Sequence, residues 1–243
     1  MALISVQNVD IFQGNSLILS DVSFKINKGE FIYIVGKTGA GKSSLLKTLT
    51  GEISIKKGKV NVGGFEVNEL TETSLPFYRR EIGIASFESP ILDVPCSFHD
   101  IFITALKAAG WRDLKLMKER IHTVCSDFGV QKFLYRRLTE LSMGQYYQFR
   151  ITLAFLNMPK VIFLDGISKY FDPETNENLM QVFISYVKKW ECTILMATHD
   201  YISINRYPNR LLTISNGQLL DEEDPEYYSK IETEVKSIIY VFD

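Results

Sequence analysis

Residues that could bind phosphate are concentrated between Gly36 and Ser43, in the stretch GKTGAGKS. This is the pattern G-x-x-x-x-G-K-S of a phosphate-binding loop, and it lies between an apolar run at 31–35 and a predicted helix at 43–50. Glycines let the backbone N–H groups turn inward toward phosphate oxygens, and a helix N-terminus adds partial positive charge. The residues expected to hold a nucleotide here are Gly36, Lys37, Thr38, Gly39, Ala40, Gly41, Lys42, Ser43 and Ser44.

Two of these residues have defined chemistry in such loops. Lys42 is expected to reach the β- and γ-phosphates, and the Ser43 hydroxyl is expected to bind Mg²⁺. An acid at the end of a hydrophobic strand would complete the metal site, and Asp165 directly follows the apolar run 161–164. A polar segment at 142–145 opens another predicted helix, and His199 follows the predicted strand 193–197. The sequence therefore predicts a site for a nucleotide and Mg²⁺.

The elements around these residues predict an α/β fold. Strands alternate with helices, which implies a mainly parallel sheet, with antiparallel strands on the N-terminal side. A block of helices at about 88–157 interrupts this order and is expected to be an inserted subdomain. Residues 1–220 are predicted to form one domain. The tail 221–243 begins with an acidic break and continues as a predicted helix, docked on its own domain or facing a partner.

Composition excludes several classes of protein. Lysine and arginine number 27 against 29 acidic residues, so no overall positive charge favours nucleic acid. The sequence contains no apolar run of the ~18 residues that a membrane-spanning helix needs. Its N-terminus does not have the pattern of a signal peptide. Three cysteines without metal-type spacing predict buried thiols in a reducing compartment. We therefore expect a soluble, cytoplasmic protein, for which any membrane contact would come through a partner.

With these motifs in place, residues 3–220 resemble the ATP-binding cassette (ABC) family of phosphate-loop NTPases. Three segments are most similar to its FtsE branch, cell-division ATPases that pair with the membrane protein FtsX: PFYRREIG at 76–83, LMATHD at 195–200 and LLTISNGQL at 211–219. The resemblance implies ATP and Mg²⁺ as cofactors and a head-to-tail dimer. Each ATP would lie between Gly36–Ser43 of one chain and a signature segment of the other. The signature residues implied to bind ATP are Ser142, Gly144 and Gln145.

The resemblance also implies roles for residues outside these loops. His199 would contact the γ-phosphate. Phe12 would stack on adenine, although an ordinary aromatic at a strand end fits it equally. Asp172, after Phe171, matches a loop that touches the opposite chain, or it caps the helix that begins at Pro173. An FtsX-like membrane protein would dock on the cytoplasmic side, with contacts expected from Phe87–Phe98. Ile91, Leu92, Val94 and Phe98 are apolar enough for that contact and equally apolar enough to be core. Nucleic acid is not expected as a partner.

Three positions depart from the family's pattern. Gly166 occupies the place of the glutamate that polarises the attacking water, and a positioned general base typically contributes ~10²–10⁴-fold to the rate. Phe87 replaces a glutamine that senses Mg²⁺, with Glu88 beside it as a displaced substitute. Met143 replaces a glycine of the signature segment. The residues for binding thus remain while those for activating water are lost.

This selective loss favours a nucleotide-binding scaffold with weak or absent hydrolysis over a second hypothesis, an active ATPase that powers an ABC-type complex. In a variant of the scaffold hypothesis, the chain pairs with a competent sister ATPase. That site would then combine the sister's phosphate loop with this chain's Ser142–Gln145.

Overall fold

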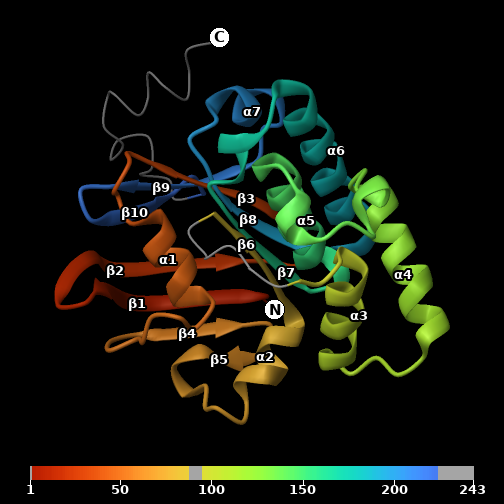
Figure 1. Cartoon of the computed structure of the whole chain (residues 1–243). Helices are drawn as coiled ribbons and strands as arrows, with labels where there is room; N and C mark the ends of the chain where they lie inside the picture. Colours follow the sequence, from red (N-terminus) through yellow and green to blue (C-terminus); the bar gives the residue numbers. More distant parts are fainter. Residues whose placement is uncertain (1, 88–94, 224–243) are drawn as a thin grey trace.

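The computed structural model describes residues 2–87 and 95–223, which form two β-sheets with helices around them (Figure 1). The larger sheet has six strands in the order β10-β9-β3-β8-β7-β6. Their bounds are Phe31–Gly36 for β3, Ile82–Ser86 for β6, Val161–Asp165 for β7, Thr193–Ala197 for β8, Arg210–Ser215 for β9 and Gln218–Asp221 for β10. Neighbouring strands of this sheet are parallel, except that β10 is antiparallel to β9. The α/β prediction is confirmed.

The smaller sheet is antiparallel and has the order β2-β1-β4-β5. It consists of β1 (Ile4–Gln13), β2 (Ser16–Ile26), β4 (Lys59–Val62) and β5 (Phe65–Glu66). Its strands alternate between buried and exposed residues, as in β2, whereas every residue of β3 is buried. A strand covered on both faces has no solvent side for polar residues, which explains the uninterrupted apolar run in β3.

Each face of the larger sheet contributes to a different apolar core. Ile32 and Ile34 of β3 face the smaller sheet and helix α1 (Lys42–Leu49), while Tyr33 and Val35 face the helical layer. This division follows from the two-residue period of a strand. The helical layer contains α3 (Phe98–Ala108), α4 (Leu114–Asp127) and α5 (Met143–Leu156), which lie between β6 and β7 in sequence, and α6 (Pro173–Trp190).

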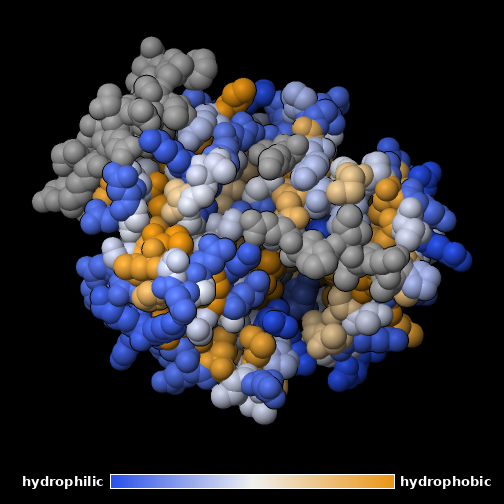
Figure 2. Space-filling model, turned by 60° about the vertical axis from the view of Figure 1, so that its left-hand side comes forward, coloured by the Kyte–Doolittle hydropathy of each residue, from blue (hydrophilic) through white to orange (hydrophobic). Residues whose placement is uncertain are grey.

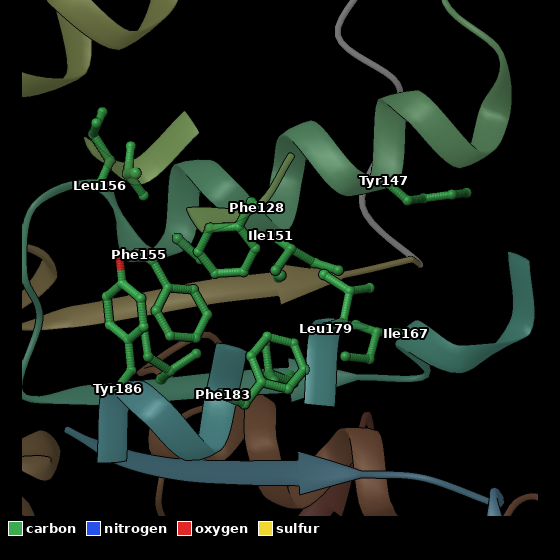
Figure 3. Packing of buried hydrophobic residues seen from close by; sticks show 14 of the residues in the cluster. Phe128, Tyr147, Ile151, Phe155, Leu156, Ile167, Leu179, Phe183 and Tyr186 are labelled. Carbon is green, nitrogen blue, oxygen red and sulfur yellow. The ribbon is translucent and has the colours of Figure 1, made fainter. Parts of the chain in front are cut away.

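Helices α5 and α6 meet through aromatic rings (Figure 3). Phe155 of α5 stacks on Phe183 of α6 with ring centroids 5.5 Å apart and nearly parallel planes. The buried guanidinium of Arg120 in α4 donates to the carbonyl oxygens of Phe155 and Leu156 at 2.7 and 2.8 Å. Since the last carbonyls of a helix have no partners within it, this cation both caps α5 and joins it to α4.

Helix α5 also touches the sheet directly. A Cβ atom at Gly83 of β6 would lie 2.1 Å from the carbonyl oxygen of Ala154, so only glycine permits this approach of strand to helix. Two short helices complete the fold, α2 (Leu75–Glu81) and α7 (Tyr201–Arg206), together with four 3-10 turns, η1 (Val67–Glu69), η2 (Gln131–Phe133), η3 (Leu138–Glu140) and η4 (Ile167–Tyr170). The sequence did not predict α7.

Other predictions have mixed outcomes. Cys125 and Cys192 are buried, but Cys96 is exposed, so the prediction of buried thiols is wrong for one of three.

Hydrophobic side chains on the face in Figure 2 lie in small groups among hydrophilic ones. Among the residues described, no helix combines the length and hydrophobicity needed to span a membrane. Glu88, Ile91, Leu92, Val94 and the tail from Asp224 lie outside the described residues, and the domain boundary at residue 220 stays a prediction.

Candidate nucleotide site

The phosphate loop joins the end of β3 to the start of α1, as the sequence predicts. Its three glycines have φ angles of 148°, 81° and 108° at Gly36, Gly39 and Gly41. Gly41 is the N-cap of α1, and a Cβ there would lie 2.7 Å from the Ile18 side chain of β2. A side chain would therefore be both strained and obstructed at this position. The glycine keeps the first N–H groups of α1 available beside the loop.

Lys42 lies inside the loop, with only 8% of its surface exposed. Its Nζ donates to the carbonyl oxygens of Gly36 and Lys37 at 2.8 and 3.0 Å. Burial lowers the pKa of Lys42 to about 8, against the opposing attraction of the Asp165 carboxylate. Part of the lysine population is therefore neutral near pH 8, and an anion beside the ammonium would restore the charge.

A pocket of about 410 Å³ opens beside this loop. Predicted site residues that line it are Thr38, Gly39, Gly41, Lys42, Ser43, Ser44, Asp165 and His199. Asp165 ends β7 and pairs in register with Ala197 of the parallel strand β8, so the chain that leaves β8 brings His199 to the same edge of the sheet. The carboxyl ends of neighbouring parallel strands thus assemble the acid, the histidine and the loop, as expected for this fold type.

Other predicted site residues lie elsewhere. Lys37 and Ala40 line a separate cavity of about 340 Å³ on the other side of the loop, between Leu17 and the turn at Asn216. Gly36 is buried at the end of β3. Phe12 does not line the pocket, and Lys56 Nζ lies 5.0 Å from the centroid of its ring.

The signature segment also lies outside this pocket. Ser142 is the N-cap of α5, and it forms a capping box in which its hydroxyl accepts from Gln145 N and the Gln145 side chain accepts from Ser142 N. Met143 is 44% exposed. A Cβ at Gly144 would lie 3.4 Å from the Tyr170 carbonyl oxygen. One chain therefore does not bring Ser142, Gly144 and Gln145 to its own phosphate loop.

The wall of the pocket opposite the loop is aromatic. Phe87 lines it, and its ring centroid lies 3.8 Å from that of Tyr147 in α5 and 5.0 Å from that of Tyr170 in η4. Tyr147 and Tyr170 stack on each other at 4.6 Å, and Phe171 meets Phe87 at 6.5 Å. We call Phe87, Tyr147, Tyr170 and Phe171 the aromatic wall. Tyr147 lies in the N-terminal half of α5 and extends away from the Phe155 and Phe183 rings (Figure 3).

Gly166 lies against this wall. Its φ of 66° is left-handed, and its N–H donates to Ala197 O at 3.1 Å, so the backbone turns directly after Asp165 into η4. A Cβ at Gly166 would lie 3.7 Å from the Phe87 ring. Sequence reasoning identified Phe87 and Gly166 as departures but missed Tyr147 and Tyr170. The only signal for these tyrosines was an aromatic pair after each polar segment, at 146–147 and 170–171.

Two further predictions concern Asp172, which precedes helix α6, and the Mg²⁺ site. Asp172 caps α6, accepting from Thr175 N at 2.9 Å, and these hydrogen bonds hold the pKa of its carboxyl below the usual value. The predicted capping role is confirmed. No group of three acidic, histidine or cysteine ligands occurs in the described part of the chain. The Ser43 hydroxyl and Asp165 carboxylate do line one pocket, and such a sparse set suits Mg²⁺, which keeps waters and phosphate oxygens as its other ligands.

A model of the ABC transporter family matches residues 19–168, which contain the phosphate loop, the signature segment and Asp165. The chain belongs to the ABC transporter family. It is 30% identical over 229 residues to the cell division ATP-binding protein FtsE of Streptococcus pneumoniae serotype 2, covering 93% of this chain and 98% of FtsE. It is 29% identical over 224 residues to the methionine import ATP-binding protein MetN of Clostridioides difficile, covering 92% of this chain and 69% of MetN.

Solved ABC cassettes have the same fold. A dimeric ATP-binding cassette in a post-hydrolysis state with ADP and Pi superimposes with a TM-score of 0.79 at 22% identity, over 89% of this chain and 96% of that one. The cassette cbiO1 of Clostridium perfringens, part of the transporter complex cbiONQ, superimposes with a TM-score of 0.79 at 20% identity. The match covers 99% of this chain and 96% of cbiO1. The chain is thus an ABC ATP-binding subunit of the transporter type. Subunits of this family bind ATP, typically with Mg²⁺, and work in dimers with membrane permeases.

Proposed function

We propose that this ABC subunit is FtsE-like, that it holds Mg-ATP in a head-to-tail dimer, and that it hydrolyses ATP weakly or not at all. Its role would be a nucleotide-dependent scaffold that docks an FtsX-like membrane protein at the cytoplasmic face of the membrane, in cell division or another envelope process. The observation that supports this most strongly is the contrast between the two sides of the pocket. The phosphate loop side is polar, whereas the opposite side presents Phe87 and Gly166.

The binding half of the proposal follows from the groups in the pocket. Lys42 would exchange its two carbonyl partners for the β- and γ-phosphates, and the anions would hold its proton. Ser43 and Asp165 would hold Mg²⁺, which when bound would neutralise charge between the phosphates. His199 is exposed two residues after β8 and lines the same pocket, where it would contact the γ-phosphate. The second phosphate contact would come from Ser142, Gly144 and Gln145 of another chain.

The proposed weakness in hydrolysis follows from the aromatic wall. Activation of a water needs an acceptor within hydrogen-bond reach of it, about 2.6–3.2 Å between heavy atoms. Gly166 has no side chain, and the Phe87 ring is half-buried beside it and has no acceptor atom. The Tyr147 and Tyr170 rings hold Phe87 in this place. Position 166, where the family has its water-activating glutamate, is therefore next to the hydrocarbon ring of Phe87.

Similarity supports the FtsE branch and also a second candidate. The 30% identity to pneumococcal FtsE extends over nearly the full length of both chains, and the FtsE of Mycobacterium tuberculosis is also 30% identical, over 210 residues. A methionine import subunit reaches 29%, however. The second candidate is therefore an active ATPase subunit that powers a transporter or an FtsEX-like complex.

Single-turnover hydrolysis of labelled Mg-ATP separates the two candidates. Purified protein in excess is mixed with ATP, and bound nucleotide and released phosphate are counted in the same sample. We expect bound ATP with no phosphate above the background of a Lys42→Ala variant. Turnover near 1–10 s⁻¹, ordinary for enzymes, would contradict the scaffold and favour the active ATPase. Addition of a sister ABC subunit tests whether a mixed dimer is required.

A further inference from the structure

Positive charge is concentrated in the helical block. Residues 95–157 contain nine lysines and arginines and five acidic residues, whereas the rest of the chain contains eighteen and twenty-four. The chain's small net charge thus hides a positive block beside a negative remainder. Part of the excess is gathered at one corner of the molecule, where the turn between α3 and α4 comes close to α2 in the lower part of Figure 1.

Contacts between these segments fix the corner in place. The Trp111 indole donates to Asn157 Oδ1 at 2.8 Å, and Asn157 Nδ2 donates to the Arg80 carbonyl oxygen of α2 at 2.8 Å. A Cβ at Gly110 would lie 3.8 Å from the Arg80 guanidinium. The Arg80 guanidinium in turn lies 5.1 Å from the centroid of the Phe77 ring. Residues 77–80 and 107–118 therefore form one continuous surface, which we call the basic corner.

Among the described residues, the exposed cations of this surface are not paired with acids. Within the described part of the chain, no ion pair is made by its exposed cations Arg79, Lys107, Arg112, Lys115 and Lys118. The acids nearby are largely engaged. Asp113 accepts from Lys115 N and Leu116 N as the N-cap of α4, and Glu81 pairs with Lys160 at 2.7 Å. Within segments 77–81 and 107–119 the remaining acid is Glu119, so lysine and arginine outnumber acidic residues six to three there.

Large apolar side chains lie among these cations. Leu114 and Leu116, in the first turn of α4, are 55% and 51% exposed, and Phe77 is 57% exposed. Exposed apolar groups ringed by lysine and arginine are the composition that binds at an anionic membrane interface, where apolar tips enter the acyl boundary and cations lie at headgroup level. An acidic polymer or protein surface would account for the cations alone. The two leucines favour lipid.

We propose that the basic corner, formed by α2 and the α3–α4 turn, binds directly to a surface of anionic lipid headgroups. This contact goes beyond the proposed function, since it requires neither nucleotide nor a membrane protein. Its effect would be to hold the subunit at the membrane and to orient it there. Each lysine or arginine near such a surface strengthens binding about fivefold, so a pair contributes about 25-fold.

Vesicle sedimentation of the full chain tests the proposal. Vesicles of phosphatidylcholine alone and vesicles with about one third phosphatidylglycerol are compared at low salt, where surface charges are least screened. We expect binding only to the anionic vesicles, about 25-fold weaker for Lys115→Gln/Lys118→Gln and at least about tenfold weaker for Leu114→Ser/Leu116→Ser. The matched control is Lys188→Gln/Lys189→Gln, which removes two exposed lysines beside the exposed Trp190 of α6 and should change nothing.

Three results would overturn it. These are no binding to anionic vesicles, an equal loss in the α6 control, and full binding by the leucine variant, which would indicate a purely electrostatic contact suited to an acidic protein. All four substituted corner residues are exposed, so the variants should fold, and unchanged thermal unfolding and ATP binding verify this. Because neither nucleotide nor partner is present in the assay, its failure would leave the proposed function untouched.

Discussion

The two sides of the nucleotide pocket are built from the same sheet edge but have opposite chemistry. On one side, the loop between β3 and α1 presents Lys42 and Ser43, and Asp165 lies at the proposed metal position. On the other, the ends of β6 and β7 lead into Phe87 and Gly166. The strands themselves are equally regular on both sides. We therefore predict that binding and water activation can be changed separately in this pocket.

The largest expected change comes from rebuilding the aromatic side. A Phe87→Gln/Gly166→Glu variant should raise single-turnover hydrolysis by ~10² or more, because it supplies an acceptor and removes the ring beside it. Gly166→Glu alone should gain less, since the glutamate would meet the Phe87 ring, which lies 3.7 Å from a Cβ at this position. The strain of a side chain at φ 66° is the same in both variants and does not distinguish them. Phe87→Gln alone is the control. Equal rates in the single and double glutamate variants would show that Phe87 plays no part.

Removing the loop cation tests the polar side. Lys42→Ala should weaken Mg-ATP binding ~10–100-fold, the range for losing charge-assisted hydrogen bonds of ~1.5–3 kcal/mol. Lys37→Ala is the matched control within the same loop. Its exposed side chain lines the separate cavity on the other side of the loop. The affinity for Mg-ATP should therefore change less than threefold, about 0.6 kcal/mol. Titration calorimetry measures both. Equal losses would mean that general loop charge, rather than the buried lysine, holds the phosphates.

The lowered pKa of Lys42 predicts that the affinity for ATP depends on pH. Burial favours the neutral amine in the free protein, with a pKa of about 8, whereas bound phosphate favours the ammonium. Binding therefore takes up a proton above pH 8, and affinity for ATP should fall up to tenfold per pH unit between pH 8 and 10. A Lys42→Arg variant, which stays charged, should give a flat profile. Flat profiles for both proteins would contradict the buried-lysine account.

The smallest expected effect is on stability. Phe87→Ala should lower the free energy of unfolding by ~1–2 kcal/mol, because a half-buried ring loses its contacts with Tyr147 and Tyr170. Phe77→Ala is the control, since that ring is 57% exposed and meets only the Arg80 guanidinium among the ring contacts of the described chain, so its loss should stay below ~1 kcal/mol. Urea unfolding measures both. A Phe87 effect no larger than that of Phe77 would mean that the aromatic wall does not hold the strand end in place.

The polar side was predictable because its signal is local. The glycines, Lys42 and Ser43 follow one another in sequence, and their strand and helix are adjacent. Asp172 was also readable as a cap, because Pro173 follows it. The aromatic wall was not predictable, since Phe87, Tyr147 and Tyr170 meet only after β6, α5 and η4 are packed. Helix α7 was missed because its six residues show no helical period. Asp200 was a usable signal, since it caps α7 by accepting from Ser203 N.

The contact between Gly83 and Ala154 gives helix α5 a mechanical role. Ser142 lies twelve residues before Ala154, or ~18 Å along the helix axis at 1.5 Å per residue. The close approach of the Ala154 carbonyl to Gly83 would make this contact a natural pivot if the helix tilted on β6. A tilt of ~5° about that point would move Ser142 by ~1.5 Å, enough to break a hydrogen bond. Close packing at Gly83 is therefore expected to affect the position of the signature segment at the other end of α5.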